Sequence, residues 1–90
     1  MERVELIVHG RVQGVFFRQF VTDNARRLNL RGFTRNLNDG TVEIVAEGDM
    51  NKLQKLVEIC EQGSPASEVD KVKVTFSRGE QEFSGFNPKY

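Results

Sequence analysis

The chain has 90 residues, a length that predicts one small domain spanning residues 1–90. Its 13 lysine and arginine residues balance 13 aspartate and glutamate residues, and this zero net charge argues against binding nucleic acid or anionic membranes through bulk charge. One cysteine excludes an intramolecular disulfide, and together with a single histidine it leaves no Cys/His metal cluster.

The chain also carries no targeting pattern. Every apolar run is far shorter than the roughly 18 residues that a membrane-spanning helix needs. Glu2 and Glu5 fall where a secretory signal would have a basic and then an apolar stretch. We therefore expect a monomer in the reducing cytoplasm, with no membrane partner.

The first third of the chain predicts a strand, a glycine loop and a helix. Residues 4–9 alternate between apolar and polar side chains, as in a half-buried strand. Two glycines within residues 10–14 then predict a tight loop. From Phe17 to Leu28 the apolar residues follow helical spacing, and Asn29 is suited to end this helix in the left-handed conformation.

The remainder predicts a hairpin, a second helix and two strands. Residues 32–37 and 41–47 read as strands, and the Asp39-Gly40 pair between them is typical of a hairpin turn. Three further elements are expected: a helix capped by Asp49 that begins at residue 50 and stops at Gly63, a strand over residues 69–77, and a short edge strand over residues 83–87 before Pro88.

This order of elements predicts an α+β fold of the ferredoxin-like class, β-α-β-β-α-β. The expected sheet is antiparallel, with four to five strands and with both helices on one face. Because this architecture hosts many unrelated activities, the function has to be argued from the site.

The connection between the first strand and the first helix, residues 10–18, is the segment best suited to bind an anion. A helix N-terminus carries unpaired N–H groups and a positive partial charge, and a glycine loop leading into it can wrap further N–H groups around a phosphate. Arg18 adds a planar fork that can hold a phosphoryl group through two hydrogen bonds. On these residues alone the loop is a candidate oxyanion site, and a plain connection with an exposed arginine stays open.

The same run, GRVQGVFFR, resembles the first signature of the acylphosphatase family, small enzymes that hydrolyse the carboxyl-phosphate bond. A second run resembles the second signature of the same family. It consists of Gly32 to Asn36, GFTRN, followed by DGTVE at residues 39–43. The resemblance covers essentially the whole chain. It departs from the family pattern at Phe33, where many members have tryptophan, and at Asn29, where many have glycine, and both positions bear on packing or capping.

The resemblance implies an enzyme that uses no metal, no organic cofactor and no phosphoenzyme. By similarity, Arg18 binds the phosphate and Asn36 orients the attacking water. The substrate would be a small-molecule acyl phosphate, and inorganic phosphate would be both product and competitive inhibitor. The backbone amides implied to cradle the phosphate are those of Val12, Gln13, Gly14, Val15, Phe16 and Phe17.

The side chains that the loop lacks agree with this chemistry. An acyl phosphate expels a carboxylate whose conjugate acid has a pKa of about 4, so the leaving group needs no general acid at neutral pH. A phosphate monoester expels an alkoxide and usually needs one. No enzymic base is evident, and we expect the proton of the water to pass to a phosphate oxygen of the substrate.

Several other residues have a structural interpretation. His9 is expected to be a strand or rim residue, and Cys60 a small hydrophobe on the apolar stripe of the second helix. Arg35 should face away from Asn36, because successive strand residues point to opposite faces. Asp39 is explained by the turn. Three aromatic residues are expected in the core, Phe16, Phe17 and Phe20, with a place in the wall of the phosphate cradle as the open alternative for Phe16.

Two non-catalytic alternatives stay open. One is a ferredoxin-like module that binds RNA, since Arg31-Gly32-Phe33 resembles the start of a base-stacking motif, although Thr34 and Arg35 interrupt it. The other is a domain that binds phosphate or carbamoyl phosphate within a larger assembly, as in carbamoyl-transfer maturation proteins.

Overall fold

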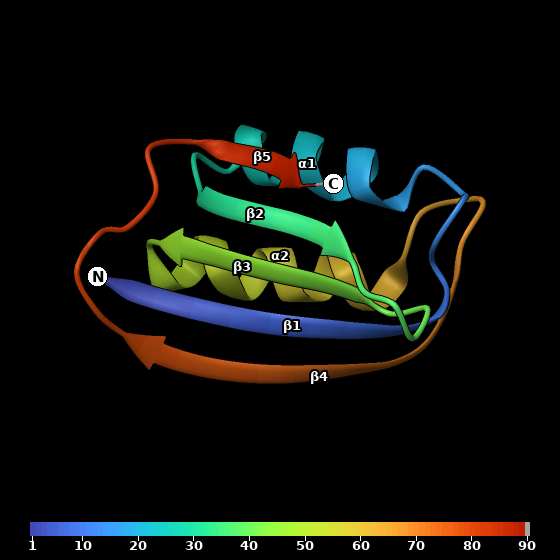
Figure 1. The fold of residues 1–90 in the computed structure, drawn as a ribbon. Coiled ribbons are helices and arrows are strands. Elements are labelled where there is room, and N and C mark those ends of the chain that lie inside the picture. Colours follow the sequence, from blue (N-terminus) through green and yellow to red (C-terminus); the bar gives the residue numbers. More distant parts are fainter. Residues whose placement is uncertain (90) are drawn as a thin grey trace.

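Residues 1–89 are described by a computed structural model, and they form a layer of two helices on a five-stranded sheet (Figure 1). Both helices cover the same face of the sheet (Figure 1). The predicted ferredoxin-like α+β fold is therefore confirmed. The elements in chain order are β1 (Glu2–Arg11), α1 (Phe17–Arg27), β2 (Arg31–Asn36), β3 (Val42–Gly48), α2 (Met50–Gln62), β4 (Glu68–Arg78) and β5 (Phe86–Lys89).

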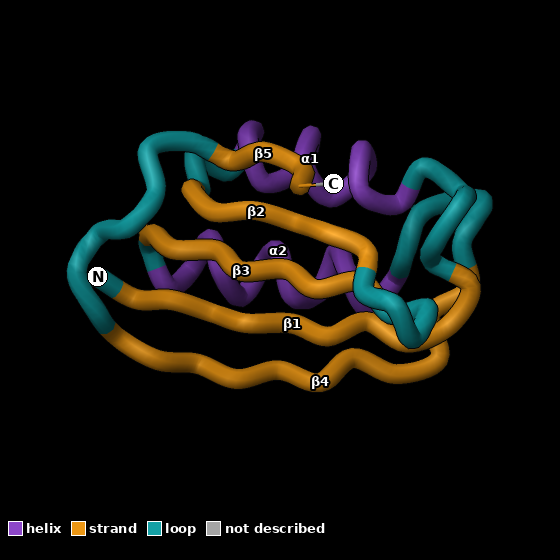
Figure 2. The backbone as a smooth tube through the Cα atoms, viewed as in Figure 1, coloured by secondary structure: helices purple, strands orange, loops and turns teal. Residues whose placement is uncertain are grey.

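The sheet has the strand order β4-β1-β3-β2-β5 (Figure 2). β1 pairs antiparallel with β3 and β4, and β2 pairs antiparallel with β3. β5 pairs in parallel with β2, so the prediction of an entirely antiparallel sheet is wrong at this edge. The path of the chain explains the difference. Residues 79–85 cross one end of the sheet and enter beside the start of β2, where the Gly32 N–H donates to the Gly85 carbonyl at 2.9 Å.

The last strand also extends further than its sequence pattern suggests. The expected edge strand spanned residues 83–87, whereas β5 begins only at Phe86 and includes Pro88, which is in register with Thr34. An edge strand tolerates a proline because it has a neighbouring strand on one side only, so the missing N–H can face the open side. The extension brings Pro88 and Lys89 to the start of α1.

The core lies between the sheet and the two helices, at the positions that strand alternation and helical spacing predicted. No helix within residues 1–89 is long and apolar enough to cross a membrane. The buried apolar residues that the central strands and the helices contribute to this core cluster are Val4, Leu6, Val8, Val42, Ile44, Ala46, Phe17, Val21, Ala25, Leu53, Leu56 and Cys60.

Both predicted helix caps are confirmed. Asn29 follows α1 with a left-handed φ of 57°, and the Leu30 N–H donates to the Ala25 carbonyl at 3.0 Å, as in a Schellman motif. At the start of α2, the Asp49 carboxylate accepts a hydrogen bond from the Asn51 N–H at 2.8 Å. Each cap joins residues close together in the chain, which is why the sequence alone predicted it.

A buried carboxylate holds the crossover between β4 and β5. Glu47 of β3 is fully buried and accepts hydrogen bonds from the Phe83 N–H at 2.9 Å and from the Glu82 N–H at 3.0 Å. Arg3 forms an ion pair with it at 3.1 Å. Burial acts to raise the pKa of Glu47, but the hydrogen bonds from Phe83, Arg3 and Glu82 outweigh burial and hold the pKa below its ordinary value.

Candidate active site

The loop between β1 and α1 is shorter than the sequence predicted. Gly10, which was expected in the loop, belongs to β1, as does His9. The pairing of β1 with β4 shifts its register between these two residues, as at a β-bulge. A Cβ on Gly10 would lie 2.1 Å from the Glu68 carbonyl oxygen, and the φ of Gly10 is 131°. Glycine is therefore required where β1 passes this close to β4, just before the loop begins.

The loop leads directly into the N-terminus of α1, at the end of the sheet where the β2–β3 turn also lies (Figure 2). Gly14 has a φ of 73°, and Phe16, the N-cap of α1, has a left-handed φ of 61°. The Phe16 side chain makes no cap hydrogen bond, and the first turn of α1 carries no acidic residue.

The N–H groups of the loop are not engaged in backbone hydrogen bonds within the described residues. Among the backbone hydrogen bonds of turns, loops and caps within residues 1–89, none is donated by an N–H of residues 13–17. The positive end of the α1 dipole lies at the same place. This segment therefore has N–H groups that can donate to a bound anion.

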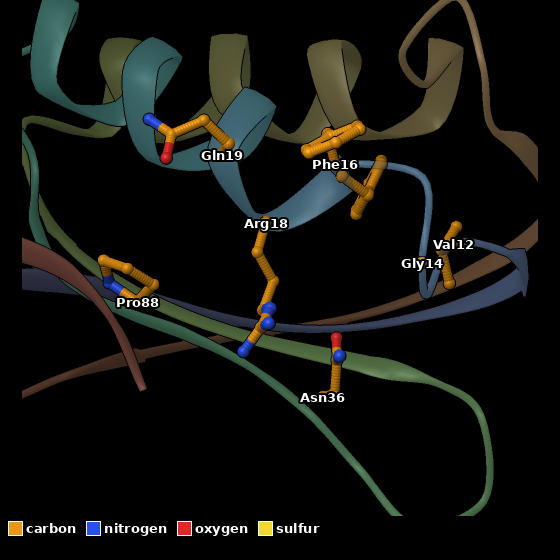
Figure 3. Close-up of a pocket in the computed structure, with 8 residues that line it drawn as sticks. Val12, Gly14, Phe16, Arg18, Gln19, Asn36 and Pro88 are labelled. Atoms are coloured by element: carbon orange, nitrogen blue, oxygen red, sulfur yellow. The ribbon is translucent and has the colours of Figure 1, made fainter. Parts of the chain in front are cut away.

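The two aromatic residues at the start of α1 differ in environment. Phe17 is buried, as predicted, whereas Phe16 is 87% exposed, so its predicted core position is wrong. The left-handed backbone at Phe16 carries its side chain out of the core, and the ring lies at the rim of a cavity (Figure 3). Phe20 is partly buried against the core, with its ring 6.0 Å from that of Phe17.

Arg18, the second residue of α1, extends from the helix start into the space between α1 and the sheet (Figure 3). Its Nη1 donates a hydrogen bond to the Lys89 carbonyl at 3.0 Å. This contact exists because β5 runs parallel to β2 and ends near the start of α1. The local sequence around Arg18 could not have predicted it.

Asn36, the last residue of β2, points into the same space as Arg18 (Figure 3). It is in register with Val42, a core residue, so its side chain lies on the face that the helices cover. Its Oδ1 is buried and receives no hydrogen bond from any residue within 1–89. A buried oxygen without a donor costs about 1–3 kcal/mol, and a bound water that donates to it removes this cost.

These side chains surround a cavity of about 500 Å³. The Gln13 side chain is directed to the β2–β3 turn, and the Val15 side chain packs against the core, so neither side chain lines the cavity; the prediction for both residues concerns their backbone amides. Gln19 and Pro88 line it without having been predicted. Gln19 could have been found from its place in the first turn of α1, whereas Pro88 depends on the pairing of β5. The predicted residues that line the cavity are Val12, Gly14, Phe16, Phe17, Arg18 and Asn36.

The other polar candidates have the structural roles predicted for them. Cys60 is buried in α2, and burial raises the pKa of its thiol to about 12. Arg35 forms an ion pair with Glu43 across the strands. Asp39 accepts hydrogen bonds from the Thr41 hydroxyl at 2.6 Å and from the Thr41 N–H at 3.0 Å, and these bonds lower the pKa of Asp39. Within residues 1–89, no group of three His, Cys, Asp or Glu side chains could hold a metal ion.

The fold and the cavity define a ferredoxin-like α+β protein with an arginine at a helix start facing a strand-end asparagine. The family model described as acylphosphatase matches residues 4–88. An acylphosphatase of Pelotomaculum thermopropionicum is 49% identical over 84 residues, which cover 93% of this chain and 91% of that protein. The chain belongs to the acylphosphatase family.

Solved structures agree with this assignment. The crystal structure of acylphosphatase from Bacillus subtilis matches with a TM-score of 0.96 and 46% identity, covering 100% of both chains. A crystal structure of HypF from T. kodakarensis matches with a TM-score of 0.85 and 31% identity, covering 100% of this chain and 12% of that one. The same fold thus also occurs as a small part of a larger protein.

Proposed function

We propose that this protein hydrolyses acyl phosphates by direct attack of water on phosphorus, with no metal and no phosphoenzyme. The products are a carboxylate and inorganic phosphate. The observation that carries the proposal is the buried Oδ1 of Asn36, which receives no hydrogen bond from any residue within 1–89. Asn36 lines the same cavity as Arg18 and the start of α1. Membership of the acylphosphatase family supports the reaction class.

The phosphoryl group is bound by charge and by directed N–H groups. The backbone amides of residues 12–17 donate to its oxygens at the positive end of α1, and the φ of 73° at Gly14 lets the loop curve around them. Arg18 contributes a guanidinium whose parallel N–H groups match two phosphoryl oxygens. Its 3.0 Å hydrogen bond to the Lys89 carbonyl holds the side chain at the cavity.

Asn36 positions the attacking water, because its Oδ1 accepts a hydrogen bond from that water. The water oxygen attacks phosphorus opposite the acyl oxygen, the bond from phosphorus to that oxygen breaks, and the carboxylate leaves with the electron pair. One proton of the water passes to a phosphate oxygen. The carboxylate needs no general acid, since its conjugate acid has a pKa of about 4. Arg18 and the loop amides stabilise the charge on the transferring group.

Steady-state hydrolysis of acetyl phosphate, in the presence of EDTA, tests the proposal. Because Arg18 contacts the reacting group, we expect Arg18→Ala to lower kcat/KM by about 10³-fold or more. Arg35→Ala is the matched control, since Arg35 is an exposed arginine paired with Glu43 outside the cavity. No hydrolysis by the unaltered protein, or near-normal activity of Arg18→Ala, overturns the proposal.

The role of Asn36 has its own test. Asn36→Ala should lower kcat by roughly 10²–10³-fold, because one positioned polar group typically contributes this much. The inhibition constant of inorganic phosphate should stay within twofold, since Asn36 holds water and not phosphate. Phosphate should compete with acetyl phosphate in both proteins. A parallel loss of phosphate affinity would instead make Asn36 a binding residue, and noncompetitive inhibition would contradict a shared phosphate site.

The outer face of the sheet does not favour the RNA-binding alternative. Phe33 is the residue on which a base would stack, and its ring has an edge contact from Phe83 at 5.7 Å between centroids. The Lys89 ammonium lies 3.9 Å from the ring centroid of Phe33. A base would have to displace these neighbours. We expect no binding of a single-stranded RNA oligonucleotide in fluorescence anisotropy at low salt.

We further propose that the chain works as a single-domain monomer in the cytoplasm. The thiol of Cys60 is buried and so cannot join two chains through a disulfide. Light scattering after size-exclusion chromatography should give the mass of one chain in the active fraction. Urea unfolding should show one cooperative transition.

A further inference from the structure

The side chain of Gln13 joins the loop to the β2–β3 turn. Its Nε2 donates one hydrogen bond to the Leu37 carbonyl and one to the Thr41 carbonyl, each at 2.8 Å. A carboxamide nitrogen has two N–H groups, so both are used on this turn. The turn is closed on itself by the Leu37 N–H, which donates to the Thr41 carbonyl at 2.9 Å. Gln13 therefore binds both ends of an already closed turn.

The two hydrogen bonds of Gln13 connect two parts of the site that the sheet does not connect directly. The loop follows β1 and Asn36 ends β2, but β3 lies between these two strands. Neighbouring strands are about 4.8 Å apart, so β1 and β2 are separated by roughly 10 Å with no direct hydrogen bonds between them. Leu37 directly follows Asn36. The bonds of Gln13 thus connect the loop to the residue next to Asn36 along the chain.

We propose that Gln13 is a positioning residue, whose side chain sets the distance between the water held by Asn36 and the phosphoryl group held by the loop. This inference rests on the proposed function and adds to it a role for the Gln13 side chain, which touches neither water nor phosphate. Reacting atoms have to approach to about 3–3.5 Å, and an error of about 1 Å can cost about 10²-fold in rate. The two hydrogen bonds of Gln13 fix the loop that follows β1 relative to the end of β2, with β3 between them.

Gln13→Met tests this, because methionine has a similar length and no N–H donor. We expect kcat for acetyl phosphate to fall by roughly 10–100-fold. KM and the inhibition constant of inorganic phosphate should stay within twofold, because the loop amides and Arg18 are retained. Gln81→Met is the matched control: Gln81 Nε2 also donates to a backbone carbonyl, that of Phe83 at 3.0 Å, outside the cavity. This control should keep the kcat of the unaltered protein.

A double-mutant cycle with Asn36→Ala tests whether the loss of kcat in Gln13→Met arises through Asn36. If Gln13 acts through Asn36, then adding Gln13→Met to Asn36→Ala lowers kcat no further. Circular dichroism and a thermal melt check that each variant is folded. A second variant, Gln13→Glu, places a carboxylate against two carbonyl oxygens and should lose at least as much kcat as Gln13→Met.

The outcomes separate this inference from the proposed function. If the unaltered protein hydrolyses acetyl phosphate and needs Arg18 and Asn36, but Gln13→Met keeps its kcat, the positioning role is wrong and the proposed function stands. Additive losses in the cycle, or phosphate affinity that falls together with kcat, show that Gln13 shapes the phosphate site and also overturn the positioning role. Absence of hydrolysis by the unaltered protein overturns both.

Discussion

Replacing Gly10 with alanine tests whether the bulge at the end of β1 is required for the fold and for the loop that follows. The new Cβ would lie 2.1 Å from the Glu68 carbonyl oxygen and 2.8 Å from the Asp70 backbone nitrogen, both in β4. Real Cβ atoms essentially never approach other atoms within 3.0 Å. β1 and β4 would therefore have to separate locally by about 0.9 Å.

The size of the effect follows from two costs. Overpacking of this kind typically lowers stability by about 1–3 kcal/mol, and a backbone φ of 131° adds strain of about 1–3 kcal/mol for a residue with a Cβ. We expect Gly10→Ala to lower the free energy of unfolding by about 3–5 kcal/mol. Gly14→Ala is the matched control, because Gly14 has a φ of 73° but no atom within 4 Å of the new Cβ. Strain alone predicts a loss of about 1–2 kcal/mol there.

Urea unfolding followed by circular dichroism measures both variants against the unaltered protein. In a thermal melt, each kcal/mol corresponds to about 4–8 °C for a domain of this size, so the two variants should be clearly resolved. Gly10→Ala should also lose activity, since the loop begins at the displaced strand. Equal losses of stability for the two variants would refute the reasoning that contact with Glu68, beyond backbone freedom, requires glycine at this position.

Three further predictions concern charge and reactivity. Arg18→Lys should lower kcat/KM for acetyl phosphate by about 10²-fold in steady-state kinetics, because an ammonium cannot make the paired hydrogen bonds of a guanidinium; activity within threefold would contradict this. The lowered pKa of Glu47 means that its contribution to stability is present above the ordinary value of 4.5 and is lost as pH falls through the lower folded-state value. Urea titrations should therefore show a stability that falls below pH 4.5, with a shallower fall in Glu47→Gln. Because the Cys60 pKa is about 12 and the side chain is buried, Ellman's reagent at pH 8 should leave the native protein unlabelled and label it fully in urea; rapid native labelling would show an accessible thiol.

The features that sequence predicted correctly depend on residues close together in the chain. The start of α1 at Phe17 and the caps at Asn29 and Asp49 involve partners within one or two helical turns. In the hairpin turn, the Asp39 carboxylate accepts a hydrogen bond from the Thr41 N–H, two residues further along. Short-range rules for spacing, caps and turns are sufficient for such features.

The features that sequence missed depend on contacts between distant residues or on a single backbone angle. The parallel pairing of β5 and the inclusion of Pro88 follow from a crossover whose path no local pattern encodes. Glu47 finds its backbone partners 35 and 36 residues further along the chain, so the alternation of β3 could not reveal them. Phe16 was placed in the core by its apolar character, and one left-handed φ reverses that.

The candidate site divides in the same way. Elementary chemistry indicated an anion site at the loop and Arg18, because a glycine loop at a helix start has a general affinity for phosphate. Asn36 on its own would have been taken for a polar surface residue, and the family resemblance gave it a role. The Asn36 Oδ1 gives the proposed water-positioning role a physical argument, since a buried acceptor that receives no hydrogen bond is suited to hold a water.

The missed contacts are connected to one another, and together they link the far end of the sheet to the proposed site. Glu47 fixes the crossover through the Phe83 N–H, the crossover enters β5 beside Gly32, and β5 ends with the Lys89 carbonyl that accepts a hydrogen bond from Arg18. Arg18 is thus oriented by a segment that is distant in sequence. Backbone groups of this segment form the hydrogen bonds that hold it in place. A carbonyl group in a paired strand has little freedom to move, and this supports the proposal that the guanidinium is positioned before substrate arrives, as electrostatic catalysis requires.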